Sequence, residues 1–139
     1  MTKIKNTFDK DLGVQLINSK KGYCKFKLNI KPKHLNYGGI VHGGVLATLC
    51  DIALAGAVES LLKKEEWCVT AELEIRFMNP AFPGKPIYGY GQIVKRGATL
   101  AFVEGGVETS DKNQIARASG IWAIKSQPTK RIKSTRRMD

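Results

Sequence analysis

A long helix with no polar face is the feature that most constrains the fold of this 139-residue chain. A glycine-rich turn at residues 36–44 leads into a run from Gly43 to Lys63 or Lys64 whose sides are nearly all apolar. A helix that is apolar all round belongs inside a core. The carboxylate in its middle, Asp51, then needs a partner or a cavity, because a buried polar group without one is costly. The pattern therefore indicates a functional site on this helix.

Alternation of apolar and polar residues predicts strands on both sides of the helix. A hairpin precedes it, and a longer strand and three further strands follow it. Gly105 and Gly106, inside one of these strands, indicate a bulge or a close backbone approach. Two strands, one helix and four strands predict an α+β fold in which an antiparallel sheet wraps the helix. The predicted strands span residues 12–19, 23–30, 67–78, 87–95, 99–109 and 114–125.

We infer a soluble, cytoplasmic protein with one domain at residues 1–125 and a basic tail at 126–139. The most apolar run, 43–62, contains Asp51 and Glu59, which are costly in lipid, so no membrane span is expected. The N-terminus has no signal-peptide pattern. The net charge is +11, and the tail is typical of a disordered end. A nucleic-acid arm is less favoured, because the tail has no interleaved aromatic residues.

The three cysteines predict neither a disulfide framework nor a metal site. Cys24, Cys50 and Cys68 are widely spaced and form no CxxC pair. Cys50 adjoins Asp51, but neighbours in a helix point about 100° apart. Cys50 is therefore better interpreted as a small buried hydrophobe than as a nucleophile.

Motifs on and around the helix resemble those of a known family. The set comprises Asn36, His42-Gly43-Gly44, Asp51, Met78-Asn79-Pro80-Ala81 and Lys95-Arg96-Gly97. It is similar to the hotdog-fold acyl-CoA thioesterases of the phenylacetate-pathway (PaaI) and thioesterase superfamily member 2 type, over roughly residues 12–125. The resemblance implies a hotdog fold, in which an antiparallel sheet of five to six strands wraps one long central helix. It also implies a homodimer, or a homotetramer that is a dimer of dimers, with sites in clefts between subunits.

The resemblance also implies roles for particular residues. Asp51 matches the catalytic carboxylate, and His42 and Asn36 match polar groups near the thioester. The Gly43 amide would polarise the thioester carbonyl. Thr70 lies where some relatives place a serine that positions water.

Substrate contacts are implied for a second group of residues, Gly44, Lys95, Arg96 and Gly97. The two basic side chains could meet the phosphates of coenzyme A, or they could belong to a solvated hairpin. Coenzyme A is then part of the substrate, and no cofactor or metal is expected.

Purely structural roles stay open for the catalytic candidates. Asp51 could be satisfied by Thr48 or by a neighbouring strand. His42 could simply begin the helix, and Asn36 could be an ordinary turn residue. Thr70 has the opposite parity to its apolar neighbours, so it reaches the site only if that face looks across a subunit boundary.

The spacing of Gly43 and Asp51 tests the implied mechanism. Eight residues of helix separate them by about 12 Å. An oxyanion donor must lie near 3 Å from its target, so both groups of one chain cannot act on one carbonyl. A working site therefore requires Asp51 of one subunit and Gly43 of another. The sequence does not separate Asp51 as a general base from Asp51 as a nucleophile that forms an anhydride.

We therefore predict an acyl-CoA thioesterase acting on a small, medium or aromatic acyl group. One alternative is a non-catalytic acyl-CoA-binding hotdog protein that acts as a ligand sensor. A hydratase is less favoured, because no Asp-x-x-x-x-His pair lies nearby. The candidates for an aromatic pocket are Phe77, Phe82, Tyr88, Tyr90, Phe102 and Trp122.

Overall fold

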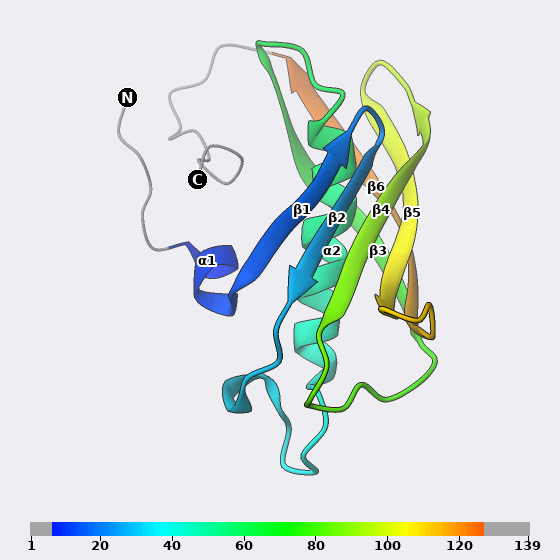
Figure 1. Cartoon of the computed structure of the whole chain (residues 1–139). Helices are drawn as coiled ribbons and strands as arrows, with labels where there is room; N and C mark the ends of the chain where they lie inside the picture. The colour runs from blue at the N-terminus through cyan, green and yellow to red at the C-terminus, as the bar shows by residue number, and fades with distance from the viewer. Residues whose placement is uncertain (1–6, 127–139) are drawn as a thin grey trace.

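One antiparallel sheet and one long helix dominate the computed structural model, which describes residues 7–126 (Figure 1). The six strands lie in the order β1-β2-β4-β5-β6-β3, and the sheet wraps α2. The predicted hotdog architecture of two strands, one long helix and four strands is confirmed. The elements are α1 (Phe8–Leu12), β1 (Val14–Lys20), β2 (Tyr23–Leu28), the 3-10 turn η1 (Pro32–His34), α2 (Gly43–Glu59), β3 (Glu66–Phe77), β4 (Ile87–Arg96), β5 (Leu100–Thr109) and β6 (Gln114–Ser126).

Two further predictions concern the basic tail and a membrane span. The predicted tail begins at Ser126, which is the last residue of β6, and its remaining residues lie outside the described part of the chain. Among the helices of residues 7–126, none is long and apolar enough to cross a membrane.

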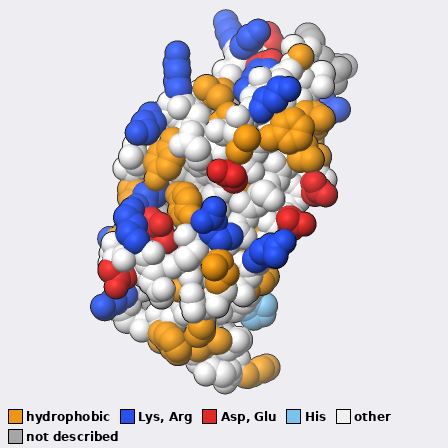
Figure 2. Space-filling view, turned by 90° about the vertical axis from the view of Figure 1, so that its right-hand side faces the viewer, with side chains coloured by type: hydrophobic (Ala, Val, Ile, Leu, Met, Phe, Trp, Pro, Cys, Tyr) orange, Lys and Arg blue, Asp and Glu red, His pale blue; other side chains and the backbone are white. Residues whose placement is uncertain are grey.

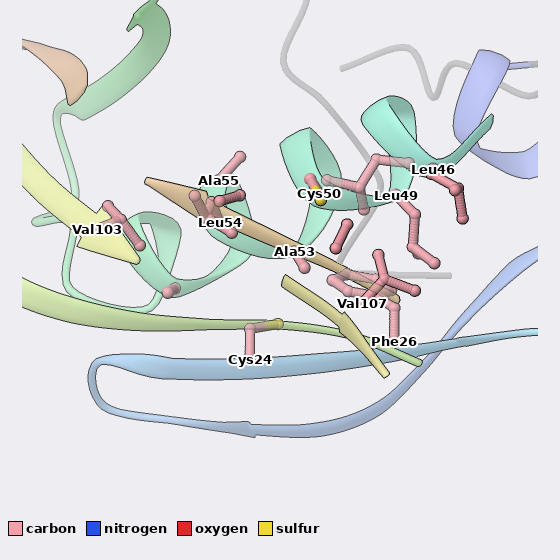
Figure 3. Close-up of a cluster of buried hydrophobic side chains, with 14 of the residues drawn as sticks. Cys24, Phe26, Leu46, Leu49, Cys50, Ala53, Leu54, Ala55, Val103 and Val107 are labelled. Atoms are coloured by element: carbon pink, nitrogen blue, oxygen red, sulfur yellow. The ribbon is translucent and has the colours of Figure 1, made fainter. Parts of the chain in front are cut away.

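The helix α2 is apolar and buried along most of its length, as predicted. All seven residues from Ile52 to Val58 are buried, together with Leu46, Leu49 and Cys50. These side chains meet residues of β2 and β5 in one cluster (Figure 3). Burial of this apolar surface is the main favourable contribution to folding.

The predicted end of α2 is wrong. The helix ends at Glu59 rather than at Lys63 or Lys64, and its last turn holds no basic residue. The Ser60 hydroxyl donates to the Ala57 carbonyl at 2.7 Å and accepts the Gly22 N–H at 2.9 Å. This side chain ties the end of the helix to the β1–β2 turn, so the chain leaves the helix there.

Two glycines of β4 let the sheet approach α2 closely. A Cβ on Gly91 would lie 2.6 Å from the Ala53 carbonyl oxygen, and one on Gly89 would lie 2.7 Å from Cγ of Leu49. Neither distance leaves room for a side chain. Gly105 makes a similar approach, because its Cβ would lie 1.9 Å from the Tyr90 oxygen. At Gly105 the structure therefore has the close approach, one of the two predicted alternatives.

We expect Gly91→Ala to destabilise the fold by about 1–3 kcal/mol, because the added methyl forces α2 away from β4. Urea denaturation followed by circular dichroism measures the change. The neighbouring exposed residue provides a control, Gln92→Ala, which should stay within about 0.5 kcal/mol. Equal urea midpoints for the two variants would show that the packing of α2 on the sheet does not depend on this close approach.

Candidate active site

The glycine-rich turn before α2 is held by the side chain of Asn36. Its Oδ1 accepts the N–H of Gly38 at 2.8 Å and that of Ile40 at 3.4 Å. Gly39 has a φ of +82°, in the left-handed region that favours glycine. In this structure the Asn36 oxygen organises the turn, which is the structural alternative noted for this residue.

His42 caps α2 and leaves one amide open. Its Nδ1 accepts the Gly44 N–H at 2.8 Å, so in the neutral ring the proton lies on Nε2. His42 and Gly43 are exposed, and within residues 7–126 the Gly43 N–H has no hydrogen-bond acceptor. The first amide of a helix lies at the positive end of the helix dipole. This amide is therefore available to an oxygen that gains negative charge.

A buried histidine, which the sequence analysis did not single out, supports this turn. His34 is 1% exposed, its Nδ1 accepts the Lys31 N–H at 2.9 Å, and its Nε2 lies 2.8 Å from the Leu12 carbonyl. Its own carbonyl accepts the His42 N–H at 2.8 Å. His34 therefore helps to fix the residue that begins α2. No spacing signal in the sequence separates it from an ordinary surface histidine.

Asp51 has a partner on the neighbouring strand. The Thr70 hydroxyl donates to Asp51 Oδ1 at 2.8 Å, Asp51 is half-buried and Thr70 is exposed. The Thr48 hydroxyl donates to the Gly44 carbonyl instead, at 2.8 Å. Of the two partners considered for Asp51, the structure therefore has the strand residue.

A bulge in β3 explains how Thr70 reaches the helix. The pairing of β3 with β6 shifts register between Thr70 and Glu72, and Thr70 lies opposite the buried Trp122. The extra residue, Ala71, moves Thr70 to the face that packs on α2 and leaves Val69 43% exposed. The parity argument for Thr70 is therefore wrong before the bulge, where Val69 is the exposed residue, and Thr70 needs no subunit boundary to meet Asp51.

The candidate residues form two groups at different places on α2. Asp51 and Thr70 lie near its middle, whereas His42, Gly43 and Asn36 lie at its start. Eight residues of helix, about 12 Å, separate Gly43 from Asp51, as predicted. Asn36 and Gly43 line a cavity of about 300 Å³ next to the end of β3. One copy of the chain therefore does not bring the two groups together.

Lys95 and Arg96, the basic pair, are the last two residues of β4. Arg96 forms an ion pair with Glu66 and donates to the Gly97 carbonyl at 2.7 Å, whereas Lys95 is exposed. Hydrogen bonds from the Lys63 amide and from Arg96 lower the pKa of Glu66. Arg96 therefore joins the β4–β5 turn to the start of β3. Contact of Lys95 and Arg96 with phosphates stays a prediction.

Most of the aromatic candidates lie away from this cavity. The outer face of the sheet carries charges of both signs among hydrophobic side chains (Figure 2). Strand alternation places Phe102, Tyr88 and Tyr90 on that face, and Tyr88 lies under the Lys25 amine at 5.0 Å. Trp122 is 1% exposed and belongs to the core. Only Phe77 of the aromatic set lines the cavity beside Gly43.

Comparisons with known proteins agree with this fold. A family model described as "Thioesterase superfamily" matches residues 38–116. Human acyl-coenzyme A thioesterase 13 is 33% identical over 105 residues, which cover 73% of this chain and 72% of the human protein.

Solved structures give the same result. The PaaI protein of the E. coli phenylacetic acid degradation operon matches with a TM-score of 0.78 at 24% identity, over 87% of this chain and 86% of that one. Zebra fish thioesterase superfamily member 2 matches with a TM-score of 0.78 at 27% identity, over 86% and 87%.

The fold and the matches define a hotdog-fold hydrolase that acts on thioester bonds. The chain belongs to the thioesterase superfamily. The family model, human acyl-coenzyme A thioesterase 13 and zebra fish thioesterase superfamily member 2 confirm the resemblance to the PaaI and thioesterase superfamily member 2 type, and the E. coli PaaI structure has the same fold.

Cys50 should be unreactive in the folded protein. It is fully buried, and burial, with a smaller contribution from Asp51, raises the pKa of its thiol to about 12. Because the thiolate is the reactive form, we expect negligible alkylation of Cys50 by iodoacetamide at pH 8 and complete alkylation after unfolding in guanidinium. Mass spectrometry of tryptic peptides measures both. Rapid labelling of Cys50 in the native protein would contradict this expectation and make Cys50 a candidate nucleophile again.

Proposed function

We propose that this protein hydrolyses acyl-CoA thioesters in a site shared by two copies of the chain. The observation that carries the proposal is the Asp51–Thr70 hydrogen bond of 2.8 Å, which fixes a half-buried carboxylate on an otherwise apolar helix. The name of the human relative, acyl-coenzyme A thioesterase 13, supports coenzyme A as the thiol part of the substrate. The acyl part is small, medium or aromatic.

Asp51 supplies the base or the nucleophile. Thr70 holds Oδ1, and within residues 7–126 no hydrogen bond engages Oδ2. As a general base, Oδ2 takes a proton from water while the water oxygen bonds to the thioester carbon. The carbon–sulfur bond then breaks, the coenzyme A thiolate leaves and takes the proton from Asp51, and the acyl group is released as a carboxylic acid. As a nucleophile, Oδ2 bonds to the carbon itself, the carbon–sulfur bond breaks, and the coenzyme A thiolate leaves and takes a proton from solvent. Water then hydrolyses the resulting anhydride, which releases the carboxylic acid and regenerates the Asp51 carboxylate.

The Gly43 amide receives the charge that develops on the carbonyl oxygen. The His42 cap keeps the helix start in place without using this N–H. Because Gly43 and Asp51 are about 12 Å apart on α2, the attacked carbonyl lies between Asp51 of one subunit and Gly43 of the other. A homodimer is the smallest assembly with complete sites, and a homotetramer would be a dimer of such dimers.

The proposed contacts to coenzyme A are those predicted from the sequence. Lys95 and Arg96, next to Gly97, are proposed contacts for the phosphates of coenzyme A, and Gly44 lies beside the reacting carbonyl. The reaction needs no metal or cofactor in this scheme, and a cytoplasmic location stays a prediction.

Asp51→Asn should lower kcat by about 10²–10⁴-fold, because the amide can neither accept the proton nor attack. Thiol release from a panel of acyl-CoAs measures the loss. Thr70→Ala should lose less, and Thr70→Ser, which keeps the hydroxyl, should retain most of the activity. If the wild type binds acyl-CoA but releases no thiol, the ligand-sensor alternative replaces the proposal.

Gly43→Pro removes the amide hydrogen and should lower kcat by about 10²–10³-fold, the effect of losing one oxyanion donor. Proline is tolerated at the first position of a helix, and His42 has the extended conformation (φ −61°, ψ 136°) that suits a residue before proline. Gly43→Ala is the matched control, because it keeps the N–H and a Cβ there lies 3.9 Å from its nearest neighbour, Phe77.

Mixed dimers test whether the site is shared. In a dimer of one Asp51→Asn chain and one Gly43→Pro chain, a shared site leaves one of the two sites intact. Coexpression with two different affinity tags isolates these dimers, and we expect about half of the wild-type activity. Mixed dimers as inactive as their parents would contradict a site built from two chains.

A further inference from the structure

The cavity of about 300 Å³ beside Gly43 has no role in the chemistry described so far. It lies where the turn before α2 meets the end of β3 and the loop that follows, and Figure 1 shows these segments at the same end of the molecule. Its apolar walls come from Ile40, Leu46, Phe77 and Met78. Thus an apolar cavity and the free N–H of Gly43 share one surface.

Two of the apolar side chains that line this cavity are exposed to solvent. Phe77 is 56% exposed and Met78 is 54% exposed, although both are large and apolar. Neighbouring exposed apolar side chains often mark a binding surface. The Phe77 ring reaches within 3.9 Å of the position that a Cβ on Gly43 would occupy. It therefore lies beside Gly43, the residue with the open N–H.

We propose that this cavity receives the acyl chain and that Phe77 and Met78 determine which chain lengths are hydrolysed. The inference rests on the proposed function, because it takes Gly43 as the carbonyl-binding amide. A carbonyl held there directs its acyl group into the cavity or along its apolar wall. The other side of the carbonyl, which carries the sulfur and the coenzyme A chain, then points away from the cavity.

The size of the cavity favours a medium-length acyl group. A dry cavity of about 150 Å³ lined by apolar side chains holds benzene. The cavity beside Gly43 is open to solvent rather than closed, and its volume is about twice as large, so an acetyl group leaves much of it empty and a palmitoyl chain extends beyond it. Apolar contact with Phe77 and Met78 favours the chains that fill the space.

A second cavity, of about 430 Å³, is also lined by the loop after β3, including Phe82 and Lys85. It contains none of the candidate catalytic residues. The two cavities share only Pro80 among their lining residues. Phe82, which is 63% exposed, therefore offers a control of similar exposure and chemistry outside the proposed acyl site.

Met78 is well suited to substitution. Its backbone N–H donates to the Ile115 carbonyl at 2.9 Å, so the main chain fixes its place and the side chain is not needed for that contact. Met78→Ala enlarges the cavity, and Met78→Trp fills it. Because the side chain is half-exposed, neither variant disturbs the packed core.

The experiment measures kcat/KM of the wild type, Met78→Ala, Met78→Trp and Phe82→Ala on acetyl-, hexanoyl-, decanoyl- and palmitoyl-CoA. We expect the wild type to prefer a medium chain. For each variant, kcat/KM for the acyl chain next longer than the preferred one is divided by kcat/KM for the preferred chain. Met78→Ala should raise this ratio by about 10-fold, and Met78→Trp should lower it by a similar factor. A change of about one methylene in an apolar pocket has an effect of this size. Phe82→Ala should keep the wild-type profile. Unchanged profiles in both Met78 variants would overturn the inference.

Two further readouts separate other outcomes. Sedimentation measures assembly: a change of oligomeric state with an equal loss on all chains would make Met78 a subunit contact and overturn the inference. Calorimetric binding of non-hydrolysable thioether analogues with the same acyl chains does not need turnover. If the wild type releases no thiol but the Met78 variants shift chain-length preference in binding, the proposed reaction fails and the acyl cavity stands. If neither rates nor binding depend on chain length, the acyl cavity fails.

Discussion

The close packing of α2 against β4 is the interaction on which the rest of the structure depends. Gly89 and Gly91 bring the strand backbone to the helix, and a methyl group at either position would collide with Leu49 or Ala53. Because the helix is apolar on nearly all sides, its position is set by the sheet that wraps it rather than by polar contacts of its own. Once the helix is fixed there, its start and its middle are fixed too. The free amide of Gly43 and the carboxylate of Asp51 therefore have defined places before any substrate binds.

The bulge in β3 turns this packing into a site. Strict alternation would place Thr70 on the outer face and bury Val69 beside the helix. One extra residue, Ala71, reverses the alternation and moves the hydroxyl to Asp51. Bulges commonly re-aim a side chain next to active sites. A carboxylate on an apolar helix is then hydrogen-bonded by the same strand whose far end, at Phe77, lies near Gly43.

Much of this could be predicted from the sequence, because it depends on local patterns. The order of the elements follows from alternation and from one apolar run, and the choice of candidate site residues follows from the glycine turn and Asp51. What could not be predicted depends on contacts between distant residues. The end of α2 at Glu59 depends on Ser60 meeting Gly22, and the pairing of Arg96 depends on Glu66. The bulge at Ala71 leaves no local sign, since Val69 and Ala71 are apolar and fit regular alternation.

The exposure of Asp51 connects assembly with chemistry. In one copy of the chain the carboxylate is half-buried and hydrogen-bonded, so the monomer fold does not bear the full cost of an isolated buried charge. In the proposed shared site, a second copy covers this part of α2, removes water from Asp51 and places another Gly43 amide opposite it. Electrostatic stabilisation of the carbonyl oxygen is worth more in such a water-excluded cleft than on an open surface. The proposed enzyme therefore gains its reactive environment on assembly, after the charged group has already been positioned by folding.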